Sequence, residues 1–256
     1  MTAHWIRGKT ILIAGSAKNL GGLIARDLAA QGAKAIAVRI NTGASKPAAD
    51  ETVAAIKAAG AGAFAFQADL TTAGAVEKLF NEAQAAMSSI DIAINTVGKV
   101  LKESMVEISE AEYDEMTAVN SKSAFFFLKE VGKHISDSGK VCNVVTSLLG
   151  AYTPFYATYA GTKAPVEHFT RSASKEFGER GISVTAIGPG RMDTPFFYPA
   201  EGVDAVAYHK TAAPPSGFSK TGLRHRGHRS LHLLPRLRRL VDDRPTILVN
   251  DGYTTK

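Results

Sequence analysis

Residues 9–30, KTILIAGSAKNLGGLIARDLAA, decide the fold of this chain. Lys9–Ala14 is a short apolar run that predicts a buried strand, and Leu23–Ala30 is an amphipathic run that predicts a helix. Gly15–Gly22 lies between them and predicts a tight glycine turn. A strand, a glycine turn and a helix N-terminus in this order can bind a dinucleotide pyrophosphate, because backbone N–H groups and the helix dipole face the phosphates. For an isolated glycine cluster, a plain turn without a ligand is the alternative.

Strands and helices alternate along the rest of the chain, which indicates a parallel sheet covered by helices on both faces. Further strands are predicted at residues 33–38, 62–67, 91–94, 140–145, 182–187 and 246–250, and helices at residues 51–59, 73–86, 110–131 and 155–177. We therefore expect a single doubly wound α/β domain of the Rossmann type over residues 1–256, with about seven parallel strands. Ligands of such domains bind at the carboxyl ends of the strands.

A second stretch, VVTSLLGAYTPFYATYAGTK at Val144–Lys163, carries a hydroxyl, a phenol and an amine. Tyr159 and Lys163 are four residues apart and share one face of a predicted helix, and Ser147 follows a predicted strand. A phenol with a pKa near ~10 is a poor acid–base catalyst at neutral pH, but a cation one turn away favours the phenolate and lowers that value. The three groups therefore suit proton transfer to a carbonyl oxygen. An ordinary surface pair is the alternative for Tyr159 and Lys163 alone.

With the glycine turn, this spacing of Ser147, Tyr159 and Lys163 resembles the catalytic signature of the short-chain dehydrogenase/reductase family, from about Lys9 to Asn250. The resemblance implies that a nicotinamide cofactor delivers hydride to a carbonyl carbon while Tyr159 protonates the developing alkoxide. Ser147 would hold the carbonyl oxygen, and Lys163 would bind the nicotinamide ribose and lower the Tyr159 pKa. Asn120 would hold a water that relays protons. The alternative is a dinucleotide-binding regulatory protein that is catalytically weak or inactive.

The same resemblance assigns a set of strand-end and turn residues to the cofactor: Gly15, Asn19, Gly21, Asp69, Asn95, Gly98, Pro189, Gly190 and Thr194. Asn19 stands where the family pattern has its middle glycine, and the turn should still form because asparagine tolerates positive φ. Of the family's Asn-Asn-Ala-Gly motif, only Asn95 and Gly98 are retained.

The cofactor type depends on the end of the second strand. Enzymes that prefer NAD usually place an acid there to bind the ribose 2′-hydroxyl, and this sequence has none until Asp50. Arg39 and Lys46 are instead suited to a 2′-phosphate, with Asn41 as a hydrogen-bond donor. The sequence therefore predicts NADPH/NADP+ in preference to NADH, and a solvated loop with two unrelated cations is the alternative.

Aromatic residues around the proposed site suggest a substrate-binding wall. Residues 191–222 are long and irregular, as substrate lids often are. The aromatic candidates are Tyr152, Phe155, Phe196, Phe197 and Tyr198, with Tyr156 beside them. Plain core packing is the alternative for such residues. The family handles ketones, oxoacyl thioesters, sugars and steroids, so the sequence predicts a small-molecule carbonyl or alcohol substrate without identifying it.

Composition bounds the remaining expectations. The single cysteine, Cys142, cannot form an intramolecular disulfide, and no His/Cys cluster has the spacing of a metal site. No apolar run approaches membrane-spanning length, and Met1–Lys9 lacks the apolar core of a signal peptide, so we expect a cytoplasmic protein and no membrane partner. By resemblance to the family we expect a homo-oligomer, most simply a tetramer.

Residues 224–245 form an anomalous basic segment. Seven arginines against Asp242 and Asp243 account for most of the net charge of +6, so the charge is local and does not predict nucleic-acid binding. Codons compatible with His225–Ser230, read one base later, permit Ile-Glu-Asp-Ile-Val-Pro, and those for Val241–Thr246 permit Trp-Met-Thr-Gly-Gln, which resembles the family. We therefore predict a frame error over this segment, and a true basic variant is the alternative. An intact mass that matches the printed sequence would exclude the frame error.

Overall fold

A parallel sheet forms the centre of the chain in the computed structural model, which describes residues 5–151, 153–190, 192, 194, 196, 198 and 246–249. Within these residues the sheet has seven strands in the order β3-β2-β1-β4-β5-β6-β7. The strands are β1 (Thr10–Ala14), β2 (Ala35–Ile40), β3 (Gly62–Gln67), β4 (Ile90–Asn95), β5 (Ile135–Val144), β6 (Ser183–Pro189) and β7 (Thr246–Val249). The predicted doubly wound sheet is confirmed.

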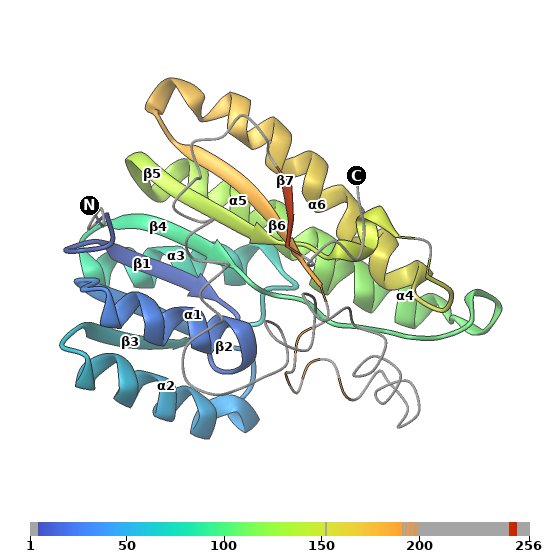
Figure 1. Cartoon of the computed structure of the whole chain (residues 1–256), viewed down its shortest axis with the longest axis horizontal. Coiled ribbons are helices and arrows are strands. Elements are labelled where there is room, and N and C mark those ends of the chain that lie inside the picture. Colours follow the sequence, from blue (N-terminus) through green and yellow to red (C-terminus); the bar gives the residue numbers. More distant parts are fainter. Residues whose placement is uncertain are drawn as a thin grey trace, which may run out of the picture.

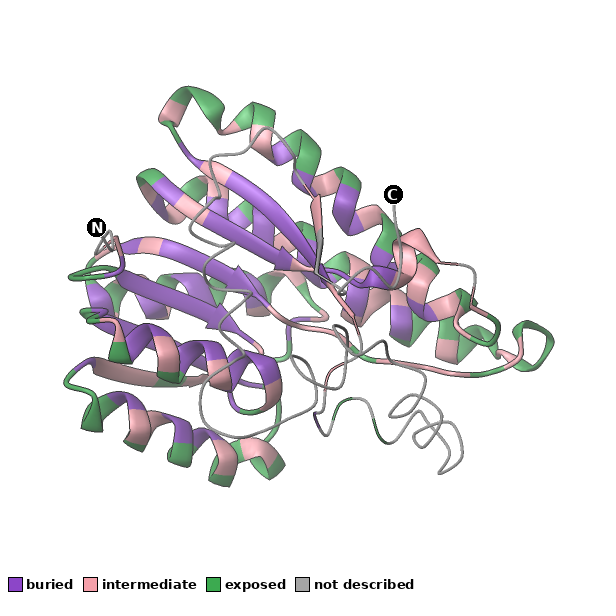
Figure 2. Cartoon of the chain, viewed as in Figure 1, coloured by how far each residue is buried: buried purple, intermediate pink, exposed green. Residues whose placement is uncertain are grey.

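Helices cover the sheet on two faces (Figure 1). The described helices are α1 (Asn19–Ala30), α2 (Lys46–Ala58), α3 (Ala73–Met87), α4 (Glu110–Thr117), α5 (Ser123–His134) and α6 (Ala157–Glu176). Strands β1 and β2 are fully buried and β4 and β6 mostly so, whereas the edge strand β3 is partly exposed. The helices alternate buried and exposed stripes (Figure 2). This pattern is the one expected of amphipathic helices on a buried parallel sheet.

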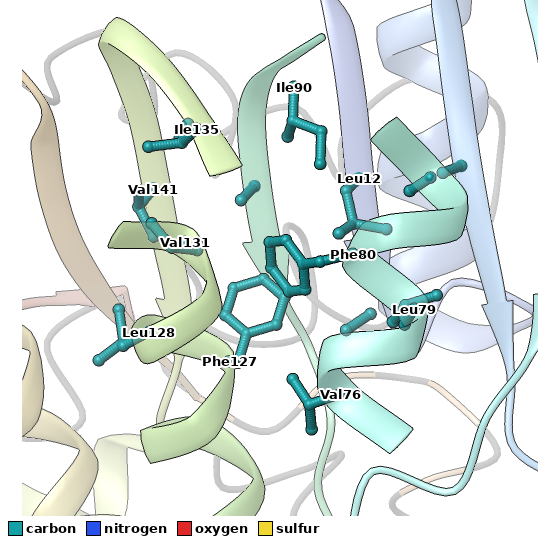
Figure 3. Close-up of a cluster of buried hydrophobic side chains, with 14 of the residues drawn as sticks. Leu12, Val76, Leu79, Phe80, Ile90, Phe127, Leu128, Val131, Ile135 and Val141 are labelled. Atoms are coloured by element: carbon teal, nitrogen blue, oxygen red, sulfur yellow. The ribbon is translucent and has the colours of Figure 1, made fainter. Parts of the chain in front are cut away.

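Successive side chains of a strand point to opposite faces of the sheet, so the core forms two layers. Ile11 and Ile13 of β1 pack in the layer of α1 and α2, and Leu12 packs with α3 and α5 on the opposite face. Phe80 and Phe127 are fully buried in this second layer, with ring centroids 5.2 Å apart in an edge-to-face arrangement (Figure 3). Truncating either ring to alanine would cost about 3–5 kcal/mol, so this cluster fixes α3 and α5 against the sheet.

The chain reverses its direction across the sheet between β1 and β4. From β1 it proceeds through β2 to the β3 edge, and from β4 it proceeds toward β7. Loops that leave the carboxyl ends of β1 and β4 therefore diverge and leave a crevice, which is where doubly wound sheets bind ligands.

Strand β5 begins at Ile135, five residues before the predicted strand 140–145, and two helices also differ locally from the sequence prediction. The helix predicted over residues 110–131 is interrupted by a π-helical turn at Ala118–Lys122, in which the Ser123 N–H bonds to the carbonyl of Ala118. The helix predicted to begin at Glu51 begins at Lys46, with Pro47 at its start, where a proline N–H is not needed.

Two segments named from the sequence lie largely outside the described residues. These are the predicted lid, of which residues 192, 194, 196 and 198 are described, and the basic segment 224–245. In the described ranges, no helix is both long and apolar enough to span a membrane, and no three His, Cys, Asp or Glu side chains are grouped to hold a metal.

Candidate active site

A cavity of about 690 Å³ opens at the carboxyl ends of the strands. It is lined by most of the residues that the sequence assigned to cofactor and catalysis: Gly15, Asn19, Gly21, Arg39, Asn41, Asp69, Gly98, Ser147, Tyr159, Lys163, Pro189, Gly190, Thr194 and Phe196. These residues run from Gly15 to Phe196 in the sequence. The parallel sheet brings them together because all its strands end at the same edge.

Five assigned residues do not line the cavity: Lys46, Asn95, Asn120, Phe155 and Tyr198. The Lys46 ammonium lies 2.7 Å from an Asp50 carboxylate oxygen on the exposed side of α2. Phe155 is 55% exposed. Tyr152 and Phe197 fall outside the described residues.

The glycine turn has the conformation that the sequence predicts. Gly15 has φ +86°, and Asn19 adopts φ +55°, so asparagine occupies the left-handed region at the place of the family's middle glycine. A Cβ on Gly21 would lie 2.4 Å from the carbonyl oxygen of Gly15. A larger residue at Gly21 would therefore clash with the backbone of Gly15 and distort the turn.

Arg39 supplies a fixed cation at one end of the cavity. Its side chain is buried, with Nε donating to the carbonyl of Ala68 at 2.7 Å and Nη2 donating to Oδ1 of Asn41 at 2.6 Å. Burial lowers the pKa of Arg39 to about 10, and the nearby charge of Asp69 opposes this shift. The guanidinium therefore stays charged at neutral pH and is held beside Asn41 and Asp69.

The two asparagines outside the lining organise the segment that follows β4. Asn95 Oδ1 accepts from the Val97 N–H at 3.0 Å. The fully buried Asn120, in the π-helical turn, accepts from the Lys99 N–H at 2.8 Å, and its Nδ2 donates to the carbonyl of Lys99 at 2.9 Å and to Oγ1 of Thr162 at 3.1 Å. Asn120 thus joins the segment after β4 to α6, directly beside Lys163.

Lys163 is a buried cation held by backbone oxygens. Its ammonium donates to the carbonyls of Val97 at 2.7 Å and Val144 at 3.0 Å. A Cβ on Gly98 would lie 3.1 Å from Nζ, so the glycine leaves room for the ammonium. Burial lowers the pKa of Lys163 from 10.5 to about 8.

Tyr159 corrects one expectation from the sequence. Burial raises its pKa to about 12, because the phenolate is disfavoured away from water, and a hydrogen bond with Thr146 partly offsets this. Lys163 was expected to lower the Tyr159 pKa, but its ammonium is directed to the two carbonyls described above. In this structure burial is therefore the larger influence on the phenol.

Ser147 and Thr146 both follow β5 and line the cavity. Ser147 is buried and begins a short 3-10 helix, Ser147–Gly150. Thr146 caps this helix by accepting from the Leu148 N–H at 3.3 Å. Sequence reasoning did not assign Thr146, although it lies directly before Ser147.

Lys18 is a second lining residue that sequence reasoning missed. It precedes α1 and Asn19 in the glycine turn. Lys18 is the only lysine or arginine in the turn Gly15–Gly22, and this feature of the sequence could have identified it as a phosphate-binding candidate.

Known proteins resemble this chain over most of its length. A family profile described as short chain dehydrogenase matches residues 9–201. The chain is 33% identical over 197 residues to elsinochrome reductase 1 of Elsinoe fawcettii, covering 75% of this chain and 71% of the relative. It is also 33% identical over 211 residues to a hydroxynaphthalene reductase-like protein of Metarhizium brunneum, covering 81% and 75% of the two chains.

Among solved structures, the chain is similar to a Burkholderia cenocepacia protein described as a candidate dehydrogenase and crystallised with bound NADP. The two share 66% sequence identity, with a TM-score of 0.91 over 100% of this chain and 97% of the other.

Proposed function

Since this chain belongs to the short-chain dehydrogenase/reductase family of NAD(P)-dependent enzymes, we propose that it reduces a small-molecule ketone or oxoacyl group to an alcohol with NADPH. One observation carries the proposal: a single cavity is lined by the glycine turn and Arg39 as well as by Ser147, Tyr159 and Lys163. Groups suited to a phosphorylated dinucleotide and to proton transfer thus share one site.

The residues present fit a dinucleotide. The close backbone at Gly15 and Gly21 and the N-terminus of α1 would hold the pyrophosphate. Asp69 and Gly98 would border the adenosine half, and Pro189, Gly190 and Thr194 would hold the nicotinamide end. When bound, the reduced nicotinamide supplies the hydride.

Arg39 supports the preference for NADPH over NADH. A guanidinium that is already oriented by Ala68 and Asn41 can bind a 2′-phosphate without losing further side-chain freedom. Lys18 adds a second cation to the cavity lining. The similar structure from Burkholderia cenocepacia with bound NADP is consistent with this preference.

The proton would come from Tyr159. With a pKa raised to about 12, its phenol is protonated throughout the neutral range, which is the state that donation to an alkoxide requires. Ser147 would hold the carbonyl oxygen. Lys163 would contact the nicotinamide ribose. Asn120, which is bonded to Lys99 in the segment after β4, would hold the water that relays protons to Lys163.

The direct test is NADPH consumption, followed by absorbance, with a panel of ketones, oxoacyl thioesters and keto sugars. We expect at least one carbonyl class to be reduced, with a higher kcat/KM for NADPH than for NADH. Binding of NADPH with no turnover on any class would favour a regulatory dinucleotide-binding protein instead.

We also propose that the protein assembles as a homo-oligomer, most simply a tetramer, through the helices around residues 110–131 and 155–177. Exposed aromatic side chains support this: Tyr113 of α4 is 55% exposed and Phe125 of α5 is 48% exposed. Phe125 also lies edge-to-face with Phe169 of α6, at 5.3 Å between centroids. Light scattering that gives a monomeric mass would contradict this assembly.

A further inference from the structure

Tyr156 is an aromatic wall residue that the proposed chemistry does not use. It immediately precedes α6, three residues before Tyr159, and its side chain lines the cavity. The two tyrosine rings lie edge-to-face, with centroids 6.4 Å apart and an interplanar angle of 61°. Tyr156 therefore presents an aromatic surface beside the proposed proton donor.

The segment after β4 contacts Tyr156 and its neighbour Phe155. The Lys102 ammonium lies 5.6 Å from the centroid of the Tyr156 ring, within the range of a cation–π contact. Next to it, the Glu103 N–H donates to the carbonyl of Phe155 at 2.9 Å. These contacts tie the segment after β4 to the turn before α6, two parts of the chain that run together in Figure 1. Tyr156 lines the cavity and Lys102 does not, so Lys102 supports the ring without being part of the lining.

Apolar side chains also line the cavity that contains Tyr156 and Tyr159. Val145 and Leu148 follow β5, and Met192 and Phe196 follow β6, and all four line the same cavity. The cavity that contains Tyr159 therefore offers aromatic and aliphatic surface to the substituent of a substrate carbonyl.

We propose that Tyr156 is a specificity-determining residue that selects ketones bearing an aromatic ring, with that ring packed against Tyr156 and the carbonyl within reach of Tyr159. The inference rests on the proposed carbonyl reduction and extends it to a substrate class. Aromatic pairs prefer offset-stacked or edge-to-face contacts, and a pre-positioned ring makes such a contact without further ordering. The Lys102 cation draws π-electron density of the Tyr156 ring toward itself, so Tyr156 should favour packing against an electron-rich substrate ring.

The test compares acetophenone with cyclohexyl methyl ketone in wild type, Tyr156→Leu and Tyr156→Phe. The quantity is the ratio of the two kcat/KM values, and comparing this ratio between variants cancels the different intrinsic reactivities of the ketones. We expect Tyr156→Leu to lower the ratio by about 5-fold and Tyr156→Phe to preserve it. Lys102→Met removes the cation, so it should lower the ratio of kcat/KM for para-methoxyacetophenone to kcat/KM for acetophenone.

If Tyr156→Leu leaves the ratio of the two kcat/KM values unchanged, the inference about Tyr156 is wrong, although carbonyl reduction itself would still stand. A second measurement does not require turnover: calorimetric binding of acetophenone and cyclohexyl methyl ketone to the NADP+-loaded protein. If no ketone is reduced, the proposed function fails, and this binding ratio in wild type and Tyr156→Leu still decides whether Tyr156 selects an aromatic ring. Equal effects of Tyr156→Leu on the binding of both ketones would contradict the inference.

Discussion

Replacing Lys163 with methionine tests whether a charged ammonium is buried beside the proposed proton donor. Burial lowers the pKa of Lys163 from 10.5 to about 8. Below about pH 8 the group is charged in both the folded and the unfolded protein, and the cost of burying the charge is present in full. Between about pH 8 and 10.5 the folded protein has released this proton while the unfolded chain keeps it. The contribution of Lys163 to stability therefore rises with pH over this window.

The size of the effect follows from the two pKa values. One pKa unit corresponds to about 1.4 kcal/mol, so the lowered pKa corresponds to roughly 3 kcal/mol in the free energy of unfolding. The Lys163→Met variant lacks this titration. We expect the stability of wild type to rise by roughly 3 kcal/mol relative to that of Lys163→Met between about pH 7 and about pH 10.5.

Urea unfolding followed by circular dichroism at a series of pH values measures this difference. Groups that titrate equally in both proteins cancel in the comparison. Lys57→Met, at an exposed position of α2, is the matched control and should show no pH-dependent difference from wild type. A difference between wild type and Lys163→Met that stays constant from pH 7 to 10.5 would refute the reasoning about the buried ammonium.

Three further substitutions test the other parts of the site. Arg39→Gln should lower kcat/KM for NADPH by about ten-fold or more and leave kcat/KM for NADH nearly unchanged, because it removes a charged hydrogen-bond donor to the 2′-phosphate. Equal losses with both cofactors would contradict this role of Arg39. Thr146→Val should raise the pKa of Tyr159 further and slow alcohol oxidation by about 5-fold, which a pH–rate profile would detect and Thr146→Ser should restore. Gly98→Ala should lower kcat by about ten-fold, because its Cβ would lie 3.1 Å from the buried ammonium, whereas Gly74→Ala, whose Cβ meets nothing within 4 Å, should keep full activity.

Much of the fold could be predicted because local sequence signals agree with the final topology. The alternation of Ile11, Leu12 and Ile13 between two core layers follows from the strand period, and the seven-stranded sheet follows from the repeated strand–helix pattern. The positive φ of Asn19 also follows from its residue type and its place in the turn.

The contacts within the site were harder to predict for side chains that can form hydrogen bonds or ion pairs with more than one group. Lys46 is drawn to Asp50 four residues along α2, an alternative that the sequence already contained. The two carbonyls that hold the Lys163 ammonium, and the burial that raises the Tyr159 pKa, depend on how β4, β5 and α6 converge. Such long-range geometry has no local sequence signature.

The most direct test of the central claim is the reduction rate of the Tyr159→Phe variant, with the affinity for NADPH measured in the same preparation. If Tyr159 is the proton donor, kcat for the best carbonyl substrate should fall by about a hundred-fold or more, while the dissociation constant for NADPH stays within about two-fold of wild type. Reduction at the wild-type rate by Tyr159→Phe, with the cofactor bound normally, would contradict the account.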